Sequence, residues 1–169
     1  MKMWRVESER LILMPKSLEE MEQLYEAETE EEMKRAYGEM IVEMKRRPEL
    51  EDWATDWTIE LKDGRTVGGI GFKGAPDEHG TVEAGYDIHE EFRGQGYASE
   101  ALGAMVEWCF KQPGVSCVRA QTEPDNLISQ KVLKNNGFIQ NGYGEEGPMF
   151  EVRRRIHGKA EGKGGIPLL

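Results

Sequence analysis

The chain has 169 residues, which suits one domain with a sizeable core, and it carries a formal net charge of −10. This acidic excess argues against a nucleic-acid partner, because such binding needs Lys and Arg to neutralise phosphates, and it is compatible with a cationic substrate. No apolar run approaches the roughly 18 residues of a membrane span, and the first residues lack the apolar core of a secretory signal. We therefore expect a cytoplasmic protein with no membrane partner.

The N-terminal third predicts a strand followed by two helices. Residues 9–15 form the expected strand, which ends at proline. Ser17 with Glu20, and Thr29 with Glu32, have the spacing of helix capping boxes. The second helix ends before Pro48, and its Met-rich apolar stripe is more typical of a core face than of a ligand surface.

The remaining elements alternate between strands and helices. Expected strands cover residues 56–61, 66–72, 81–88 and 118–122, expected helices residues 96–111 and 126–137, and a closing hairpin residues 138–143 and 149–155. This order predicts an α/β (α+β) fold with a mixed, mainly antiparallel central sheet flanked by helices. We expect one domain over residues 9–156 and a flexible C-terminal tail over 157–169. Cys109 and Cys117 are expected to be buried reduced thiols.

The stretch from residue 85 to 102 is the most informative, because it predicts a strand, a glycine-rich turn and a helix. Gly94 and Gly96 permit a tight turn whose N–H groups point inward. The following helix adds unpaired N–H groups and the positive end of its dipole. Such a turn cradles a phosphate or pyrophosphate, and Arg93 adds a positive charge. We therefore expect a phosphorylated ligand here.

Two motifs connect this turn to a known family. Residues 93–98, Arg-Gly-Gln-Gly-Tyr-Ala, match the pattern Gln/Arg-x-x-Gly-x-Gly/Ala, and residues 126–138 match an Asn-x-x-Ala/Ser helix ending in Gly-Phe. In these motifs the chain resembles the GNAT superfamily of N-acetyltransferases, and is most similar to the ribosomal-protein alanine N-acetyltransferase branch. The resemblance implies a GNAT-like fold in which the strand before the cofactor turn splays from its neighbour.

The same resemblance implies the activity and the cofactor contacts. The expected reaction transfers an acetyl group from acetyl-CoA to a primary amine, on a small molecule or a protein N-terminus, by direct attack in a ternary complex. The backbone of Ile88 would contact the pantetheine arm. Lys131 and Lys134 are candidates to contact the 3′-phosphate of CoA, although exposed helix lysines are usually only solvated. The other expected cofactor contacts are Arg93, Gly94, Gln95, Gly96, Tyr97, Ala98, Ser99, Asn126 and Ser129.

Acetyl transfer also needs a base for the amine and an acid for the departing thiolate. We favour Glu83 as the base, because a carboxylate partly desolvated in a sheet accepts a proton more readily near neutrality, with Asp87 as the reserve. The tyrosine that serves as acid in many GNAT enzymes would fall at Leu133. Tyr86, Ser129 or a bound water must then take that role, and His89 is a further candidate for a proton relay.

Other readings remain open at this point. A dinucleotide-dependent oxidoreductase would need a third glycine where Ser99 stands, and an acyl-enzyme is disfavoured because neither cysteine has an activating base beside it in sequence. A non-catalytic acetyl-CoA-binding module or sensor would keep the cofactor site without turnover. His79, His89 and His157 lack the spacing of metal ligands, so we expect no metal. The acceptor is not readable from the sequence, which also leaves a homodimer open.

Overall fold

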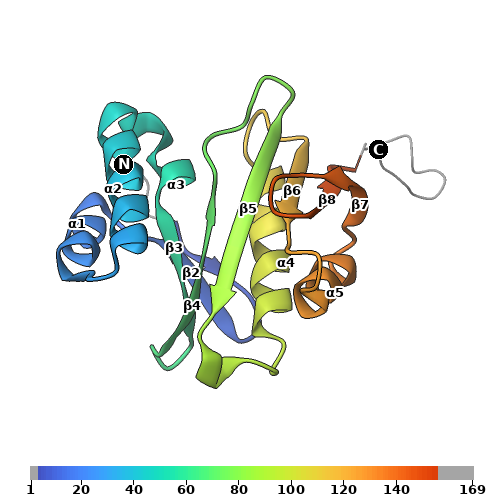
Figure 1. Ribbon diagram of the computed structural model, residues 1–169, viewed down its shortest axis with the longest axis horizontal. Helices are drawn as coiled ribbons and strands as arrows, with labels where there is room; N and C mark the ends of the chain where they lie inside the picture. Colours follow the sequence, from blue (N-terminus) through green and yellow to red (C-terminus); the bar gives the residue numbers. More distant parts are fainter. Residues whose placement is uncertain (1–3, 156–169) are drawn as a thin grey trace.

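The computed structural model describes residues 4–155, and the expected tail over 157–169 lies outside them. Its centre is an eight-stranded sheet with the order β1-β2-β3-β4-β5-β6-β8-β7 (Figure 1). Neighbouring strands are antiparallel, except that β5 and β6 are parallel. This arrangement confirms the predicted mixed, mainly antiparallel sheet. The strands are β1 (Val6–Glu7), β2 (Leu11–Pro15), β3 (Asp56–Leu61), β4 (Thr66–Phe72), β5 (Thr81–Ile88), β6 (Cys117–Gln121), β7 (Ile139–Tyr143) and β8 (Pro148–Arg153).

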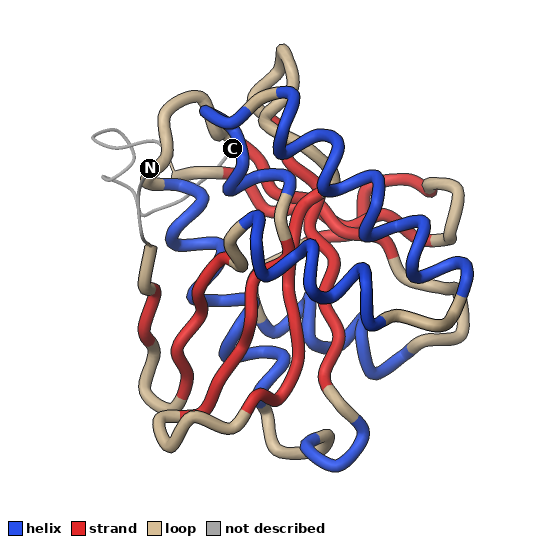
Figure 2. Tube along the Cα trace, turned by 90° about the vertical axis from the view of Figure 1, so that its left-hand side faces the viewer, coloured by secondary structure: helices blue, strands red, loops and turns tan. Residues whose placement is uncertain are grey.

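Helices cover both faces of the sheet. One group lies on one side and consists of α1 (Leu18–Ala27), α2 (Glu31–Arg46) and the short α3 (Glu51–Ala54). The helices α4 (Tyr97–Phe110) and α5 (Leu127–Asn135) lie on the other side. Figure 2 shows the first group in front of the strands. Within residues 4–155, no helix is long and apolar enough to cross a membrane.

Local capping explains where two of the helices begin. The Ser17 hydroxyl accepts a hydrogen bond from the Glu20 N–H, and the Glu20 carboxylate accepts one from the Ser17 N–H, so the predicted capping box is confirmed. The Asn126 side chain accepts from the Ser129 N–H at 3.0 Å and caps α5. The second predicted box is wrong, because α2 begins after Glu30, which has no side-chain cap.

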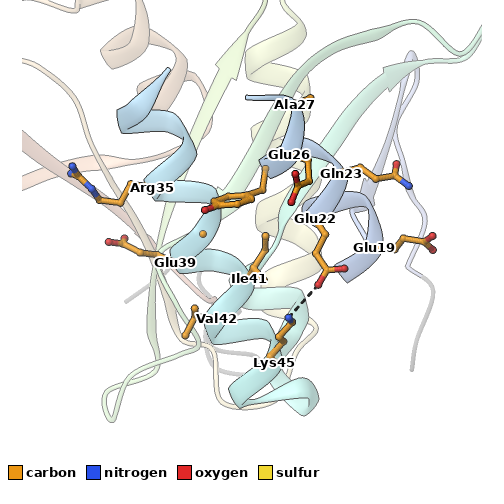
Figure 3. A pocket seen from close by; sticks show the side chains of 12 residues that line it. Glu19, Glu22, Gln23, Glu26, Ala27, Arg35, Glu39, Ile41, Val42 and Lys45 are labelled. Atoms are coloured by element: carbon orange, nitrogen blue, oxygen red, sulfur yellow. Dashed lines mark ion pairs between the residues drawn. The ribbon is translucent and has the colours of Figure 1, made fainter. Parts of the chain in front are cut away.

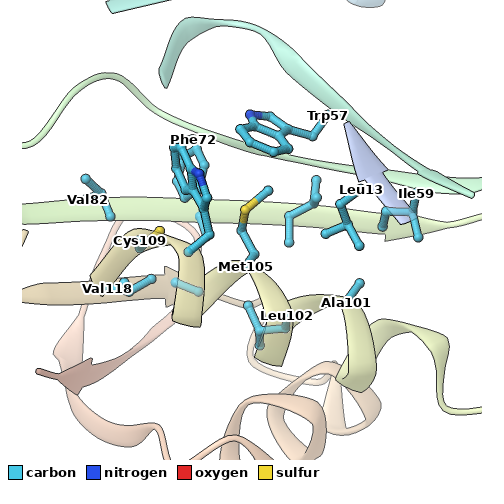
Figure 4. Close-up of a cluster of buried hydrophobic side chains, with 14 of the residues drawn as sticks. Leu13, Trp57, Ile59, Phe72, Val82, Ala101, Leu102, Met105, Cys109 and Val118 are labelled. Atoms are coloured by element: carbon cyan, nitrogen blue, oxygen red, sulfur yellow. The ribbon is translucent and has the colours of Figure 1, made fainter. Parts of the chain in front are cut away.

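The core lies between α4 and the sheet. Figure 4 shows side chains of α4, among them Leu102 and Met105, packed against strand residues such as Leu13 and Ile59. Both cysteines are buried and free, as expected. Burial raises the pKa of the Cys109 thiol well above its usual value, so this cysteine stays protonated and unreactive.

The sheet opens between β5 and β6. These strands are paired only from Thr81 opposite Cys117 to Glu83 opposite Arg119. Beyond Glu83, residues 84–88 of β5 remain paired with β4 on the other side. The edge of β5 that faces β6 is therefore unpaired over its C-terminal half, directly before the glycine-rich turn. This geometry confirms the expected splayed strand.

Candidate active site

The turn between β5 and α4 has the backbone that its glycines predict. Gly94 and Gly96 have φ values of 80° and 84°, in the left-handed region that favours glycine. None of residues 4–155 accepts a hydrogen bond from the backbone N–H groups of residues 94–99. Several of these donors belong to the first turn of α4, where the helix dipole adds positive potential. The turn can therefore hold an anion such as a pyrophosphate.

A cavity of about 540 Å³ runs from this turn along β5 and α5. Gln95 is absent from its lining, whereas Lys131 contributes to it and Lys134 does not. Because the cavity follows the unpaired part of β5, an extended pantetheine arm has both space and free backbone groups there. The predicted cofactor residues that line it are Ile88, Arg93, Gly94, Gly96, Tyr97, Ala98, Ser99, Asn126 and Ser129.

The Arg93 side chain turns back onto β5. Its Nε donates a hydrogen bond to the Ile88 carbonyl at 2.6 Å, and its Nη2 lies 3.4 Å from an Asp87 carboxylate oxygen. Arg93 thus engages the backbone carbonyl that the resemblance assigned to the pantetheine arm. The expected positive charge is beside the turn, but it is directed at the strand rather than at the free N–H groups.

Tyr86 and Ser129 meet across the opening of the sheet. The Tyr86 hydroxyl and the Ser129 hydroxyl are 2.9 Å apart, which joins β5 to α5 at the wall of the cavity. Burial raises the pKa of Tyr86, and the hydrogen bond with Ser129 only partly offsets this effect. The phenol therefore keeps its proton at neutral pH. Leu133 is fully buried in the core, so no acid occupies the usual tyrosine position.

Glu83 lies where β5 and β6 part. Its side chain is only 13% exposed, and its carboxylate accepts a hydrogen bond from the Gln121 amide at 2.7 Å. Lys73 Nζ is 3.1 Å from one carboxylate oxygen, and Arg119 Nε is 3.7 Å from the other. Lys73 also pairs with Glu146 in the loop between β7 and β8 at 3.0 Å. The predicted base is thus part of a network that ties β4, β5, β6 and this loop together.

Alternation along β5 separates the candidate base and the candidate acid. Ile88 is buried in the same core as α4, and Tyr86 contacts α5, so these residues face α4 and α5. Glu83, Gly85 and Asp87 alternate with them and therefore lie on the opposite face. A side chain at Gly85 would meet nothing within 4 Å, so this face of the strand is open there.

Two residues that sequence reasoning missed support the turn from outside. Arg10, just before β2, donates from Nη1 to the Gln95 carbonyl at 3.0 Å and from Nε to Glu100 at 2.7 Å. Glu100 lies in the first turn of α4. These residues are about 90 positions apart, so no local pattern signals their contact.

The histidines do not converge on a site. His79 lies in the loop before β5, His89 follows that strand, and His157 is outside the described residues. Among residues 4–155, no group of three or more His, Cys, Asp or Glu side chains is placed to hold a metal ion.

A second hollow lies between α1 and α2. It has a volume of about 1250 Å³ (Figure 3), and Glu22 and Lys45 form an ion pair of 3.2 Å at its edge. Glu19, Glu26 and Glu39 make its rim largely acidic. None of the residues around this groove belongs to the glycine-rich turn or to β5, so it is separate from the cavity beside β5.

Comparisons with known proteins agree with this geometry. Residues 10–139 match the family described as acetyltransferase (GNAT) domain. YjdG of Bacillus subtilis strain 168, described as an uncharacterized N-acetyltransferase, is 43% identical over 86 residues, which are 50% of this chain and 51% of YjdG. YoaA of the same organism, with the same description, is 29% identical over 148 residues, 81% of this chain and 84% of YoaA. The match to YjdG thus spans about half of that protein.

Solved structures show the same fold. A GNAT-family acetyltransferase from Bacillus anthracis has a TM-score of 0.65 at 20% identity, covering 89% of this chain and 98% of that one. RimL, a ribosomal L7/L12 alpha-N-protein acetyltransferase solved in complex with coenzyme A, has a TM-score of 0.69 at 17% identity, with coverage of 89% and 98%.

The family match spans more than half of the chain and includes both motifs that carried the resemblance. GNAT acetyltransferases use acetyl-CoA as their cosubstrate, and the turn, the unpaired strand edge and the cavity fit that molecule. The chain belongs to the GNAT acetyltransferase family.

Proposed function

We propose that this protein transfers an acetyl group from acetyl-CoA to a primary amine, by direct attack in a ternary complex. The observation that carries the proposal is the unpaired edge of β5, which runs beside a cavity of about 540 Å³ into a turn with free N–H groups. When bound, acetyl-CoA supplies the acetyl group as a reactive thioester. The acceptor is the amine of a small molecule or of a protein N-terminus, the second supported by the RimL neighbour.

The cofactor is held mainly by backbone groups. The N–H groups of residues 94–99 donate hydrogen bonds to the pyrophosphate oxygens. The N–H and carbonyl of Ile88 bind the pantetheine arm. Arg93 breaks its hydrogen bond with the Ile88 carbonyl when the arm binds there. Asn126 and Ser129, at the start of α5, border the pantetheine arm. Ser99, in the first turn of α4, lines the same cavity.

The chemistry uses the two faces of β5. Attack by the amine on the acetyl carbon releases a proton, and the departing thiolate takes one up. Glu83 receives the first proton, directly or through a water, on the face left open by Gly85. Tyr86 donates the second on the opposite face and is reprotonated through Ser129, its partner at 2.9 Å. Asp87, 72% exposed, is the reserve base.

Several parts of this proposal rest on the sequence. The acidic composition supports a cationic acceptor and argues against nucleic acid. A cytoplasmic location and the lack of a membrane partner stay predictions, and the sequence leaves the oligomeric state open.

Two measurements test the proposal in order. Calorimetry with acetyl-CoA and with NADH, both in chelator, should show binding of acetyl-CoA alone. A panel of protein N-terminal peptides, amino acids, polyamines and aminoglycosides, assayed for release of free CoA, should then identify the acceptor. Binding of NADH without acetyl-CoA would overturn the proposal. Binding of acetyl-CoA with no release across the panel would support a binding module or sensor instead.

A further inference from the structure

Arg10 connects three parts of the chain that together form the start of α4. Its Nη1 donates to the carbonyl of Gln95, between the two glycines of the turn, at 3.0 Å. Its guanidinium carbon lies 4.6 Å from the centre of the Tyr97 ring, at the first residue of α4. Its Nε donates to a Glu100 carboxylate oxygen at 2.7 Å. One side chain thus touches the turn, the first residue of the helix and its first turn.

The contact with Gln95 determines which way a peptide group points. In a trans peptide the carbonyl of one residue and the N–H of the next point in opposite directions. Because Arg10 holds the Gln95 carbonyl outward, the N–H of Gly96 points away from Arg10. Gln95 is absent from the lining of the cavity, whereas Gly96 is part of it. The Arg10 contact therefore directs the Gly96 donor into the cavity.

Glu100 holds Arg10 in this position. Its second carboxylate oxygen accepts from the backbone N–H of Arg10 at 2.7 Å and from the Ser8 hydroxyl at 2.6 Å. The Glu100 side chain is 17% exposed, and that of Arg10 is 43% exposed. Burial alone would raise the pKa of Glu100, but the hydrogen bonds from Ser8 and Arg10 outweigh burial and lower it. Glu100 is therefore ionised at neutral pH and accepts from both partners.

We infer that Arg10 is a positioning residue for the pyrophosphate of acetyl-CoA. It acts through the peptide between Gln95 and Gly96, and Glu100 and Ser8 fix its own position. The inference rests on the proposed acetyl-CoA site. Arg10 is not among the residues that line the cavity, so we assign it a role through this peptide rather than through direct contact. A preformed set of donors lowers the cost of ordering the turn when the ligand binds.

Calorimetry on the full chain tests this role. Arg10→Met keeps an apolar stem over Tyr97 but removes every guanidinium hydrogen bond, and we expect its Kd for acetyl-CoA to rise about tenfold or more. Arg10→Lys has a single ammonium for two acceptors, so its Kd for acetyl-CoA should lie between those of the wild type and Arg10→Met. Arg5→Met is the matched control, because Arg5 also pairs with a nearby glutamate, Glu7 at 2.8 Å, and lies outside the turn. It should bind acetyl-CoA like the wild type.

Two further measurements separate positioning from simple charge and from folding. Loss of affinity for 3′-dephospho-CoA should equal the loss for CoA, because both carry the pyrophosphate. In ¹⁵N NMR spectra of the free protein, the Gly96 amide signal should shift in Arg10→Met and Glu100→Gln but not in Arg5→Met. Thermal unfolding shows that each variant is folded, and Glu100→Gln serves if Arg10→Met does not fold.

The outcomes are distinct. Unchanged affinity in Arg10→Met and Glu100→Gln, with wild-type binding intact, overturns the role of Arg10 and leaves the proposed function standing. A loss confined to CoA and absent with 3′-dephospho-CoA makes Arg10 a partner of the 3′-phosphate and also overturns the inference. A wild-type protein that binds neither ligand overturns the proposed function, and the inference with it.

Discussion

At the scale of single residues, the location of Glu83 fits both a structural and a catalytic role. It is the last residue of β5 paired with β6, and it lies on the open face of that strand. Its contacts with Lys73, Arg119 and Gln121 are those of a structural residue. Its place on the open face near Gly85 is where the proposed mechanism needs a general base. Both roles are consistent with the geometry, and kinetics can separate them.

Glu83→Gln should lower turnover by more than tenfold and leave acetyl-CoA affinity nearly unchanged, because a general base contributes roughly 10²–10⁴ in rate. The loss should shrink at high pH, where the acceptor amine is already neutral. Steady-state rates across pH and calorimetry check this. Glu151→Gln is the control, since Glu151 is similarly buried (19% exposed) on β8. Equal losses of affinity and rate would assign Glu83 to shaping the opening of the sheet, and an unchanged rate would move the role to Asp87 or water.

In the proposed mechanism, Tyr86 protonates the departing thiolate. Tyr86→Phe should lower turnover by about 10²-fold with little change in acetyl-CoA affinity, because it removes only the hydroxyl. The raised pKa of Tyr86 means that its neutral form persists to higher pH than in an ordinary tyrosine, so the wild-type rate should not decline at mildly alkaline pH. Tyr143→Phe, at a 76% exposed position, is the control. A wild-type rate in Tyr86→Phe would leave a bound water as the acid.

At the scale of elements, the connection between β5 and α4 needs glycine for two reasons. Gly96 has a positive φ of 84°, and a side chain there would place its Cβ 3.3 Å from the Arg10 guanidinium. A side chain at this position would occupy space that the pyrophosphate needs in the proposed site, and it would also crowd the Arg10 guanidinium, which would have to shift slightly.

Gly96→Val should abolish acetyl-CoA binding while the domain remains folded. Gly114→Val provides a matched control, because Gly114 has a similar φ of 83° but lies in a distant loop with nothing within 4 Å of an added Cβ. Both variants should lose roughly 1–3 kcal/mol of stability from backbone strain, and only Gly96→Val should lose the cofactor. Calorimetry and thermal unfolding measure the two effects. Equal affinity in both variants would place the phosphate cradle elsewhere.

At the scale of the whole molecule, residues before position 9, where we expected the domain to begin, also pack against the sheet and the core. Val6 and Glu7 pair with β2, and Trp4 packs edge-on against Trp108 with ring centres 5.4 Å apart. The Trp4 indole N–H donates to Asp52 at 2.6 Å. Because Trp108 belongs to α4, the Trp4 contact joins the segment before the first strand to the helix that follows the glycine-rich turn.

Trp4→Ala should lower the free energy of unfolding by about 2 kcal/mol, since it removes aromatic packing and leaves Asp52 without this donor. Ile139→Ala, which changes a 73% exposed side chain on β7, should alter the free energy of unfolding by less than about 0.5 kcal/mol. Chemical denaturation of both variants measures the difference. Equal stabilities would show that the Trp4 side chain does not stabilise the domain.

Local sequence determined most of the elements and the place of the cofactor turn. The Ser17 box and the positive-φ positions Gly94 and Gly96 depend on neighbours a few residues away, so their chemistry is visible in the sequence. The capping box at Thr29 failed because Glu30 proved to be the N-cap, one residue later than the spacing indicated.

Only the tertiary structure decided how side chains from distant segments combine. The fold brings together residues far apart in the chain. Examples are the pair of Tyr86 with Ser129, the network around Glu83, and the contact of Arg10 with Glu100. Local periodicity indicates which face of an element is buried, but not which residue of another element lies opposite. The sequence thus determined the fold class and the conformation of the glycine-rich turn, and the packing of β2 and α5 against α4 and β5 decided what surrounds that turn.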